Sequence, residues 1–385
     1  MKRKIVLLLI VATAFIFFAG LGKTQTVKAD ALTDEINDQI NDIDLSELED
    51  FYDSLSVNDF DFSPVDYIND LLSGKAGTNV GDLVKYALSS FFSDFITFLP
   101  LLSGVLAVSV FGVIMKSVKS DGGSACGVVY YVELLSCVLL LLPALYSIVS
   151  SSFSAVSNMA KFCEIVSPVL LTLMTASGGT VSVSIFQPAV LLLGGGMVTI
   201  VNAFILPFAV FILIFSVISG LSKEVRLGKF TEFFTSIIKW VIGLLATVFS
   251  VFLTVQGIVG AASDGLSAKA AKYAVSNSIP IVGGLIKDGF DLIRCGSVLI
   301  KNAVGLSSVV VLFFIVLTPV LKIAALSILL KLVSAVTETV SDEKISSICG
   351  NVAKSLTYFA VSVLICGFMF FITFLLIIFT ANAYI

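Results

Sequence analysis

The residues with the clearest spacing for polar chemistry lie between two apolar runs of the chain. Four charged residues fall on one face of a predicted helix, at spacings of four, three and seven: Lys287, Asp291, Arg294 and Lys301. Asp291 can pair with Lys287 and Arg294, because side chains three or four positions apart are neighbours on a helix. Asp264 lies in the preceding stretch DGLSAKAAKYAVSNSIP. Together these residues predict a helix face that either contacts partner proteins in an assembly or lines a water-filled vestibule. The alternative is an amphipathic helix lying at the membrane interface.

The chain lacks the groups on which most hydrolytic and metal chemistry depends. It contains no histidine, which removes the commonest general base and metal ligand. Its six cysteines form no CxxC pair and no zinc-like spacing, and most lie in or beside apolar runs. The HExxH, GxSxG and P-loop signatures are also missing from the sequence. We therefore expect no catalytic, cofactor-binding or metal-binding residues and no enzyme activity, and any ATPase would be a separate subunit.

Glycines and prolines interrupt several apolar runs at membrane depth. The predicted helix breaks are Gly178, Gly179, Pro188, Gly194, Gly195, Gly196, Pro207 and Pro319. Irregular backbone is tolerated in a bilayer where it is buried in protein or lines a cavity, so these positions favour a channel or export component. The alternative is that the glycine triplet and the small residues near it only permit close packing of helices.

The composition requires that these residues be positioned within a membrane. Of the 385 residues, 57% are hydrophobic and only 13% are charged, and the mean hydropathy is +1.06. A soluble domain has about 25% charged residues, so this chain has too little polar surface to cover itself. The lipid bilayer must be its solvent. The predicted fold class is all-α, a polytopic helical membrane protein with a short helical exported N-terminal segment.

The net charge of −4 hides two parts of opposite character. From Asp30 to Asp82 there are fifteen acidic residues and one basic residue, whereas from Lys85 onward twelve acids face seventeen bases. The acidic part would repel nucleic acid, and the bases of the second part are not clustered enough to bind it. We therefore expect no nucleic-acid partner.

The N-terminus has the pattern of an export signal. Basic residues 2–4 precede the apolar run Ile5–Ala19, and Val27-Lys28-Ala29 offers a small-x-small cleavage site. We assign residues 1–29 to a signal peptide, with an uncleaved anchor helix as the alternative. In either case the positive charge stays in the cytoplasm and the next segment is exported.

Residues 30–85 form the acidic exported segment, which the sequence predicts to be helical. Ser46 and Glu49 fit a capping box ahead of an apolar pattern, and Ser63-Pro64 fits the N-cap and first residue of another helix. Short amphipathic helices of this kind need a partner surface for their apolar faces. Their acidic faces are either solvated or a docking site.

Residues 86–385 form the multi-pass membrane domain. A span needs about 20 apolar residues, and the runs that qualify are Phe91–Met115, Val128–Ser150, Ile237–Ala262, Ala303–Leu321 and Thr357–Thr380. The run Val181–Leu221 is about twice a span long, which predicts two passes with a turn near Asn202 to Pro207. Ile165–Gly179 is short and ends in a glycine pair, which predicts a tilted crossing or a re-entrant segment. The expected total is seven or eight transmembrane helices.

The positions of the basic residues decide between seven and eight transmembrane helices. They form three short clusters: Lys116 with Lys119, Lys223 with Arg226 and Lys229, and the connection that contains Lys331, Lys344 and Lys354. If Ile165–Gly179 crosses, all three clusters fall on the side opposite the acidic segment, as the positive-inside bias requires. We therefore prefer eight passes. Residues 263–302 then form an amphipathic extracytoplasmic segment.

Three stretches of the chain resemble one known protein family. They are Ser167–Pro188 (SPVLLTLMTASGGTVSVSIFQP), Val255–Gly284 (VQGIVGAASDGLSAKAAKYAVSNSIPIVGG) and Leu299–Val336 (LIKNAVGLSSVVVLFFIVLTPVLKIAALSILLKLVSAV). These stretches are similar to the stage III sporulation protein AE family of endospore-forming bacteria. The similarity runs in order over the whole chain, and it is loosest in the acidic segment.

The resemblance implies a multi-pass protein of the mother-cell membrane that surrounds the forespore. It implies partners among the other membrane proteins of the same sporulation operon, and a further partner in the forespore membrane. Together they would form a transenvelope, secretion-system-like channel that is required after engulfment.

The residues alone leave a second function open, a stand-alone secondary transporter or permease. Leu141–Ile148 and Leu317–Ala324 share the pattern Leu-x-Pro-x-Leu, and secondary transporters often contain internal repeats with broken helices. Asp94 and Glu133, the acids of the first two spans, lie near the ends of those spans, which gives little support to a proton or sodium relay.

Overall fold

The chain is a polytopic helical membrane protein, as the sequence predicts. A computed structural model describes residues 46–55, 63–73, 80–118, 125–221, 227–278, 283–339 and 343–380. Within these ranges every regular element is helical, and six helices are long and apolar enough to cross a membrane by their length and composition.

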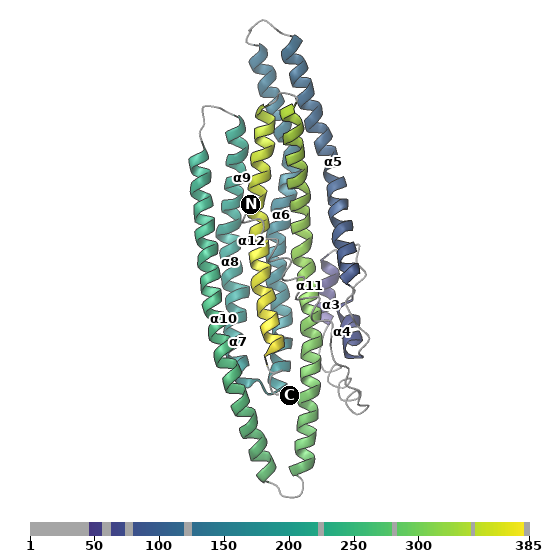
Figure 1. Ribbon diagram of the computed structural model, residues 1–385, viewed down its shortest axis with the longest axis vertical. Coiled ribbons are helices and arrows are strands. Elements are labelled where there is room, and N and C mark those ends of the chain that lie inside the picture. Colours follow the sequence, from purple (N-terminus) through teal and green to yellow (C-terminus); the bar gives the residue numbers. More distant parts are fainter. Residues whose placement is uncertain are drawn as a thin grey trace.

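The elements follow one another as antiparallel rods (Figure 1). Two short helices come first, α3 (Ser46–Ser54) and α4 (Pro64–Leu72), followed by α5 (Val80–Val118) and α6 (Ala125–Ala176). A single rod is then built from α7 (Thr180–Leu191), α8 (Val198–Ile200) and α9 (Leu206–Leu221), joined by the π-helical segments η1 (Leu192–Met197) and η2 (Val201–Ile205). The last three helices are α10 (Gly228–Ser278), α11 (Gly283–Thr339) and α12 (Glu343–Phe379).

Helices α11 and α12 form the centre of the bundle. They pack against each other, α11 also packs against α4, α5, α6 and α10, and α12 packs against α6 and α9. Glycines let these helices approach closely. A Cβ atom added to Gly305 would lie 2.4 Å from Ile378, one added to Gly367 would lie 2.4 Å from Val316, and one on Gly220 would lie 2.0 Å from Ile348. Helix contacts in membranes favour such small residues, because lipid supplies no hydrophobic driving force between helices.

The bundle is taller than a bilayer. Helices α6, α10 and α11 contain 52, 51 and 57 residues. At 1.5 Å per residue they are about 75–85 Å long, whereas the hydrocarbon core is about 30 Å thick. The lower ends of α10 and α11 extend past the C-terminal end of α12 in Figure 1. The predicted amphipathic segment, residues 263–302, therefore continues the axes of α10 and α11.

The two short acidic helices find their partner surface within the same chain. Ser63 is the N-cap of α4 and accepts a hydrogen bond from the Asp66 amide at 3.1 Å, with Pro64 at the first helical position, as the sequence predicts. The ring of Phe51 in α3 stacks on Phe162 of α6, with 5.6 Å between centroids. Ser307 of α11 donates to the Pro64 carbonyl at 3.2 Å. The apolar faces of α3 and α4 thus cover the bundle and leave their acidic residues exposed.

The structure corrects the prediction for Ile165–Gly179, which is not a separate crossing. Helix α6 is continuous from Ala125 to Ala176 and contains both Pro143 and Pro168. The polar stretch after Ser150 does not interrupt it, since the Ser152 hydroxyl donates to the Ile148 carbonyl at 2.8 Å and is satisfied within the helix. Serine therefore bonds back to its own helix here, so a polar stretch does not mark a loop.

The predicted turn near Asn202 to Pro207 is also wrong. The chain continues there as a rod, with the wider turns of η1 and η2 inserted between α7, α8 and α9. Pro207 cannot donate to the carbonyl four residues earlier, and the π-helical turn directly before it accommodates the ring without a reversal of the chain. The Asn202 amide points toward α6, where it donates to Ser157 at 3.5 Å.

Together, these two corrections leave the predicted side of every connection between helices unchanged. One crossing is lost in α6 and one in the α7–α9 rod, so six helices place each connection at the same end of the bundle as eight passes would. The C-terminal ends of α5, α9 and α11, which adjoin the three basic clusters, lie together at the upper end in Figure 1. The cytoplasmic location of that end stays a prediction.

Two ionisable side chains within the long helices, Glu133 and Lys322, face other helices. Glu133 of α6 is 5% exposed and is seated on Gly112 of α5, where an added Cβ atom would lie 2.1 Å from the carboxylate. Lys322 of α11 donates to the Ser151 hydroxyl of α6 at 3.4 Å. Charges at membrane depth usually turn inward in this way.

Cysteine labelling tests the sidedness of the bundle. In a variant whose native cysteines are replaced, a cysteine at Ser73 should react with an impermeant maleimide added from the extracytoplasmic side. A cysteine at Gly228 should react only after the membrane is permeabilised, because it adjoins a basic cluster. Labelling of Gly228→Cys in intact membranes would contradict the topology.

Substitution of a packed glycine tests the α11–α12 contact. Gly367→Leu should lower the free energy of unfolding in detergent by about 1–3 kcal/mol, the usual cost of overpacking. Gly243→Leu on α10 is the matched control, since nothing lies within 4 Å of a Cβ atom at that position. An equal decrease in the free energy of unfolding in both variants would show that Gly367 does not set the distance between α11 and α12.

Candidate functional site

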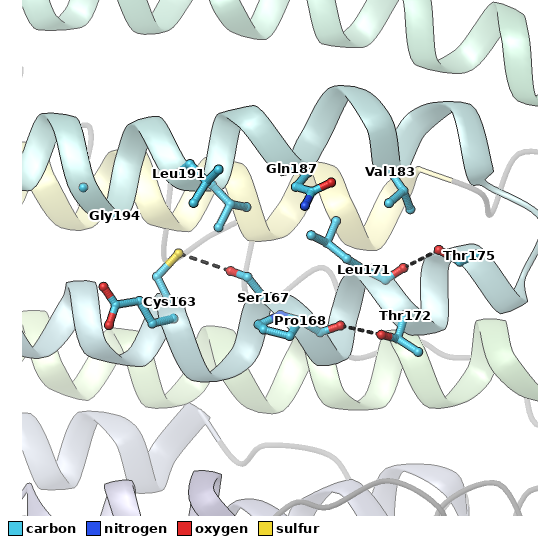
Figure 2. Close-up of a pocket in the computed structure, with 13 residues that line it drawn as sticks. Cys163, Ser167, Pro168, Leu171, Thr172, Thr175, Val183, Gln187, Leu191 and Gly194 are labelled. Atoms are coloured by element: carbon cyan, nitrogen blue, oxygen red, sulfur yellow. Dashed lines mark hydrogen bonds between the residues drawn. The ribbon is translucent and has the colours of Figure 1, made fainter.

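The part of the chain that the structure describes contains a groove between the C-terminal half of α6 and the α7–η1 rod. Its volume is about 500 Å³, within the range of ligand-sized sites. Its lining residues come from two antiparallel stretches: Cys163, Glu164, Ser167, Pro168, Leu171, Thr172 and Thr175 of α6, and Val183, Gln187, Val190, Leu191, Gly194 and Gly195 of the rod. Figure 2 shows the two walls facing each other.

The α6 wall is a helical stripe with polar and small side chains. Glu164, Pro168, Thr172 and Thr175 recur at spacings of four, four and three, so they lie along one face of the helix. The Thr172 hydroxyl donates to the Pro168 carbonyl at 2.8 Å, and Thr175 donates to Leu171 at 2.9 Å (Figure 2). The two threonine hydroxyls are thus satisfied within α6, and Glu164 is the charged group of this wall.

The opposite wall changes from an α-helix to a π-helix along its length. Gln187 and Leu191 belong to α7, and Gly194 and Gly195 belong to η1. Pro188 lies inside α7 without ending it. An added Cβ atom on Gly194 or Gly195 would meet nothing within 4 Å. The glycines therefore leave backbone open to the groove, and π-helical turns of this kind are frequent at functional sites.

A tight turn closes one end of the groove. Gly178 has a φ of +92°, a left-handed conformation that glycine adopts at little cost. Its amide donates to the Thr175 carbonyl at 2.9 Å, and the Gly179 amide donates to Met174 at 2.9 Å. These two bonds form a Schellman motif, which ends α6 and reverses the chain into α7.

Two cations from α11 bind helix ends. Arg294 donates through Nε to the Ser177 carbonyl at the end of α6, at 2.8 Å. Lys301, two turns later, is fully buried and donates through Nζ to the Thr380 carbonyl after α12. A positive charge stabilises the C-terminal end of a helix, where carbonyls lack partners and the helix dipole is negative. Both cations therefore connect elements within this chain.

The structure brings together only some of the residues that the sequence predicts. Gly178, Gly179, Arg294 and the glycine triplet Gly194, Gly195 and Gly196 belong to the turn or the π-helical wall around the groove. Pro207 lies in the first turn of α9 and Pro319 lies inside α11. The side chains of Asp264, Lys287 and Asp291 lie outside the described residues, so the predicted charged face stays a prediction.

Sequence reasoning missed the polar residues of the groove. Thr172 lies in the run Ile165–Gly179, which was predicted as a tilted crossing or a re-entrant segment, and Gln187 lies in the run Val181–Leu221, which was predicted as two passes. Glu164 precedes both runs. A signal was present, because Glu164, Pro168, Thr172 and Thr175 have the spacing of one helical face. It could be used only once α6 was known to be one continuous helix.

The groove offers side chains that can form hydrogen bonds. Glu164 is a hydrogen-bond acceptor when ionised, and the Gln187 amide both donates and accepts. Cys163 and Ser167 are within 3.3 Å of each other, but both are buried against the bundle. Among the described residues no group of three or more histidine, cysteine or acidic side chains is placed to hold a metal ion.

Comparison with known proteins adds the family. The sequence model of stage III sporulation protein AE matches residues 62–381. A protein of Bacillus subtilis (strain 168) named "Stage III sporulation protein AE" is 25% identical over 315 residues, which cover 81% of this chain and 79% of that protein. No solved structure matches the chain.

The turn at Gly178 gives a test of the role of Arg294. Arg294→Met should lower the free energy of unfolding by about 1.5–3 kcal/mol, because the change removes a charge-assisted hydrogen bond from a helix end. Lys354→Met is the control, since Lys354 is an exposed cation on α12 and surface changes usually stay within about 0.5 kcal/mol. The readout is unfolding in detergent. Equal effects of the two changes would exclude Arg294 as a helix cap.

Proposed function

The chain belongs to the stage III sporulation protein AE family, and on this premise we propose that it is a membrane component of a transenvelope channel between mother cell and forespore. This channel is secretion-system-like and is required for sporulation after engulfment. The chain lies in the mother-cell membrane around the forespore, after export directed by its N-terminal signal peptide. It performs no catalytic step, and a separate subunit supplies any ATP hydrolysis.

The observation that supports this proposal most is the height of the bundle. A protein that only moves a small solute across one bilayer needs helices of about 20 residues. Here α10 and α11 contain 51 and 57 residues and extend together past the end of α12. In the predicted topology this extension lies on the extracytoplasmic side, where a component of a channel between two membranes would meet its partners.

The acidic helices support the same orientation. Six carboxylates are exposed on α3 and α4: Glu47, Glu49, Asp50, Asp53, Asp66 and Asp70. No basic residue lies within the described parts of residues 46–73. A surface of one sign is strongly hydrated and steers proteins of opposite charge toward it. We assign this surface to the exported side, with the other membrane proteins of the operon and a forespore-membrane protein as its partners.

Purification of the native assembly tests the proposed function. The tagged chain, extracted from sporulating cells in mild detergent, should retain other membrane proteins of the same operon. A strain without the chain should complete engulfment and then fail to form heat-resistant spores. Sporulation past engulfment in that strain, or purification of the chain alone, would contradict the proposal.

A charge reversal tests the extracytoplasmic extension. Asp291→Lys should leave membrane insertion and protein level intact and block sporulation after engulfment, because reversing a desolvated charge disrupts an assembled interface. Asp264→Lys should have a weaker effect. Glu338→Lys is the matched control, an exposed acid near the opposite end of the same helix as Asp291. Normal sporulation in the Asp291→Lys strain would show that this face takes no part in the assembly.

A further inference from the structure

The two short acidic helices, α3 and α4, rest against the bundle at one height. Phe51 of α3 stacks on Phe162 of α6, with 5.6 Å between ring centroids, and Phe162 meets Phe374 of α12 edge-on, with 5.9 Å between centroids. Ser307 of α11 is fully buried and donates to the Pro64 carbonyl at the start of α4. The height of α3 and α4 in the bundle is therefore that of Phe162, Ser307 and Phe374.

This height falls within uncharged stretches of α11 and α12. In the sequence no charged residue lies between Lys301 and Lys322 on α11, and none follows Lys354 on α12. Ser307 and Phe374 lie inside these two stretches. Each stretch contains at least the roughly 20 residues that a helix needs to cross the hydrocarbon core. The acidic helices thus adjoin parts of α11 and α12 that can cross a membrane.

Helix α10 leads to the same height by a separate contact. Thr235 of α10 donates to the Tyr358 hydroxyl of α12 at 3.1 Å, and the two helices run in the same direction (Figure 1). Equal steps along the two helices lead to equal heights, because each residue adds the same rise. Val251 is as far from Thr235 as Phe374 is from Tyr358, so it lies at the height of α3. It is also at the middle of the charge-free stretch Trp240–Ser263.

The two flanks of the bundle differ in chemistry at this height. In Figure 1, α10 forms the left edge of the bundle, and α3 and α4 lie at the right edge. The exposed side chains of α10 here include Leu244, Val248 and Val251, of which Val251 is 61% exposed. On the opposite flank α3 and α4 expose their six carboxylates, and Lys161 and Glu164 of α6 are exposed too. One flank is thus uncharged and largely apolar, and the other is charged.

Placing this whole height outside the membrane does not resolve the difference. Helix α10 would then have to cross the bilayer with its upper part, which contains Lys229, Glu232 and Lys239. Lys229 and Glu232 form an ion pair whose side chains are 90% and 72% exposed, so lipid would surround both charges. Charged groups at membrane depth are costly, and they face water or one another. The arrangement that leaves neither set of charges in lipid has α10 in the bilayer and water against α3 and α4.

We propose that the flank formed by α3, α4 and the adjoining part of α6 borders a water-filled passage at membrane depth, while α10 faces lipid. Water reaches this flank from the extracytoplasmic side, to which the acidic helices are assigned. A second wall must hold lipid away from that water, and the other subunits of the assembly provide it. The inference rests on the proposed function for this second wall, and it adds which flank of the chain faces the passage.

Cysteines at one height on the two flanks test the proposal in the full-length chain. In a variant whose native cysteines are replaced, Ser54→Cys on α3 and Ser250→Cys on α10 are matched changes, because both serines are exposed. Membrane vesicles from sporulating cells are opened by freezing and thawing, so that a charged maleimide reaches both faces. Ser54→Cys should react at least about tenfold faster than Ser250→Cys, because the reactive thiolate forms in water and not in lipid. After unfolding in detergent both cysteines should react alike.

Spin labels at the same two positions distinguish lipid from protein as the cover. A label on Ser54→Cys should be relaxed mainly by a water-soluble nickel chelate, and a label on Ser250→Cys mainly by oxygen, which concentrates in lipid. The two labels together therefore report which flank is in water and which is in lipid.

Three results would overturn the inference. Equal reaction of the two cysteines in vesicles would place this height outside the bilayer. Lack of access for the nickel chelate at Ser54→Cys would show that lipid or protein covers the acidic flank. Lack of access for oxygen at Ser250→Cys would show that α10 does not face lipid. These readouts are independent of sporulation, so a strain that sporulates normally without the chain would exclude the channel role and leave the labelling pattern unchanged.

Discussion

Carbonyl groups at the end of a helix have no partner within that helix, and two such ends in this bundle receive a cation from α11. Arg294 binds the end of α6 and Lys301 binds the end of α12. In lipid this constraint is severe, because every backbone group must be satisfied by the protein itself. The two cations lie seven residues apart on one helix, so α11 fixes where α6 and α12 end relative to each other. The central position of α11 in the bundle follows from these contacts and from the glycines that seat α12 against it.

The groove depends on the same constraint. Because Gly178 and Arg294 fix the reversal after α6, α7 returns alongside α6 and contacts it. Along this return the chain inserts η1, whose glycines remove side chains from one wall. The outcome is a surface with a carboxylate, an amide and exposed backbone.

Local signals in the sequence predicted local structure well. The Ser63-Pro64 pair predicted the start of α4, and composition alone predicted a helical membrane protein. The predicted side of each basic cluster does not change with the two corrected spans, because the side of a connection depends only on whether an odd or even number of crossings precedes it; it stays a prediction. The span count itself failed, since it assumed that a helix ends after about 20 residues. Serines that bond back to their own helix, and π-helical turns before Pro207, let these helices run longer. The roles of Arg294 and Lys301 depend on carbonyls that lie 117 and 79 residues away in the chain, and no local pattern reveals such contacts.

A structure of the assembled complex, determined by electron cryomicroscopy on material from sporulating cells, tests the central claim most directly. We predict six membrane-crossing helices in each copy, with the lower ends of α10 and α11 in contact with other proteins of the assembly outside the cytoplasm. Another number of crossing helices, or lower ends of α10 and α11 that contact no other protein, would contradict the account.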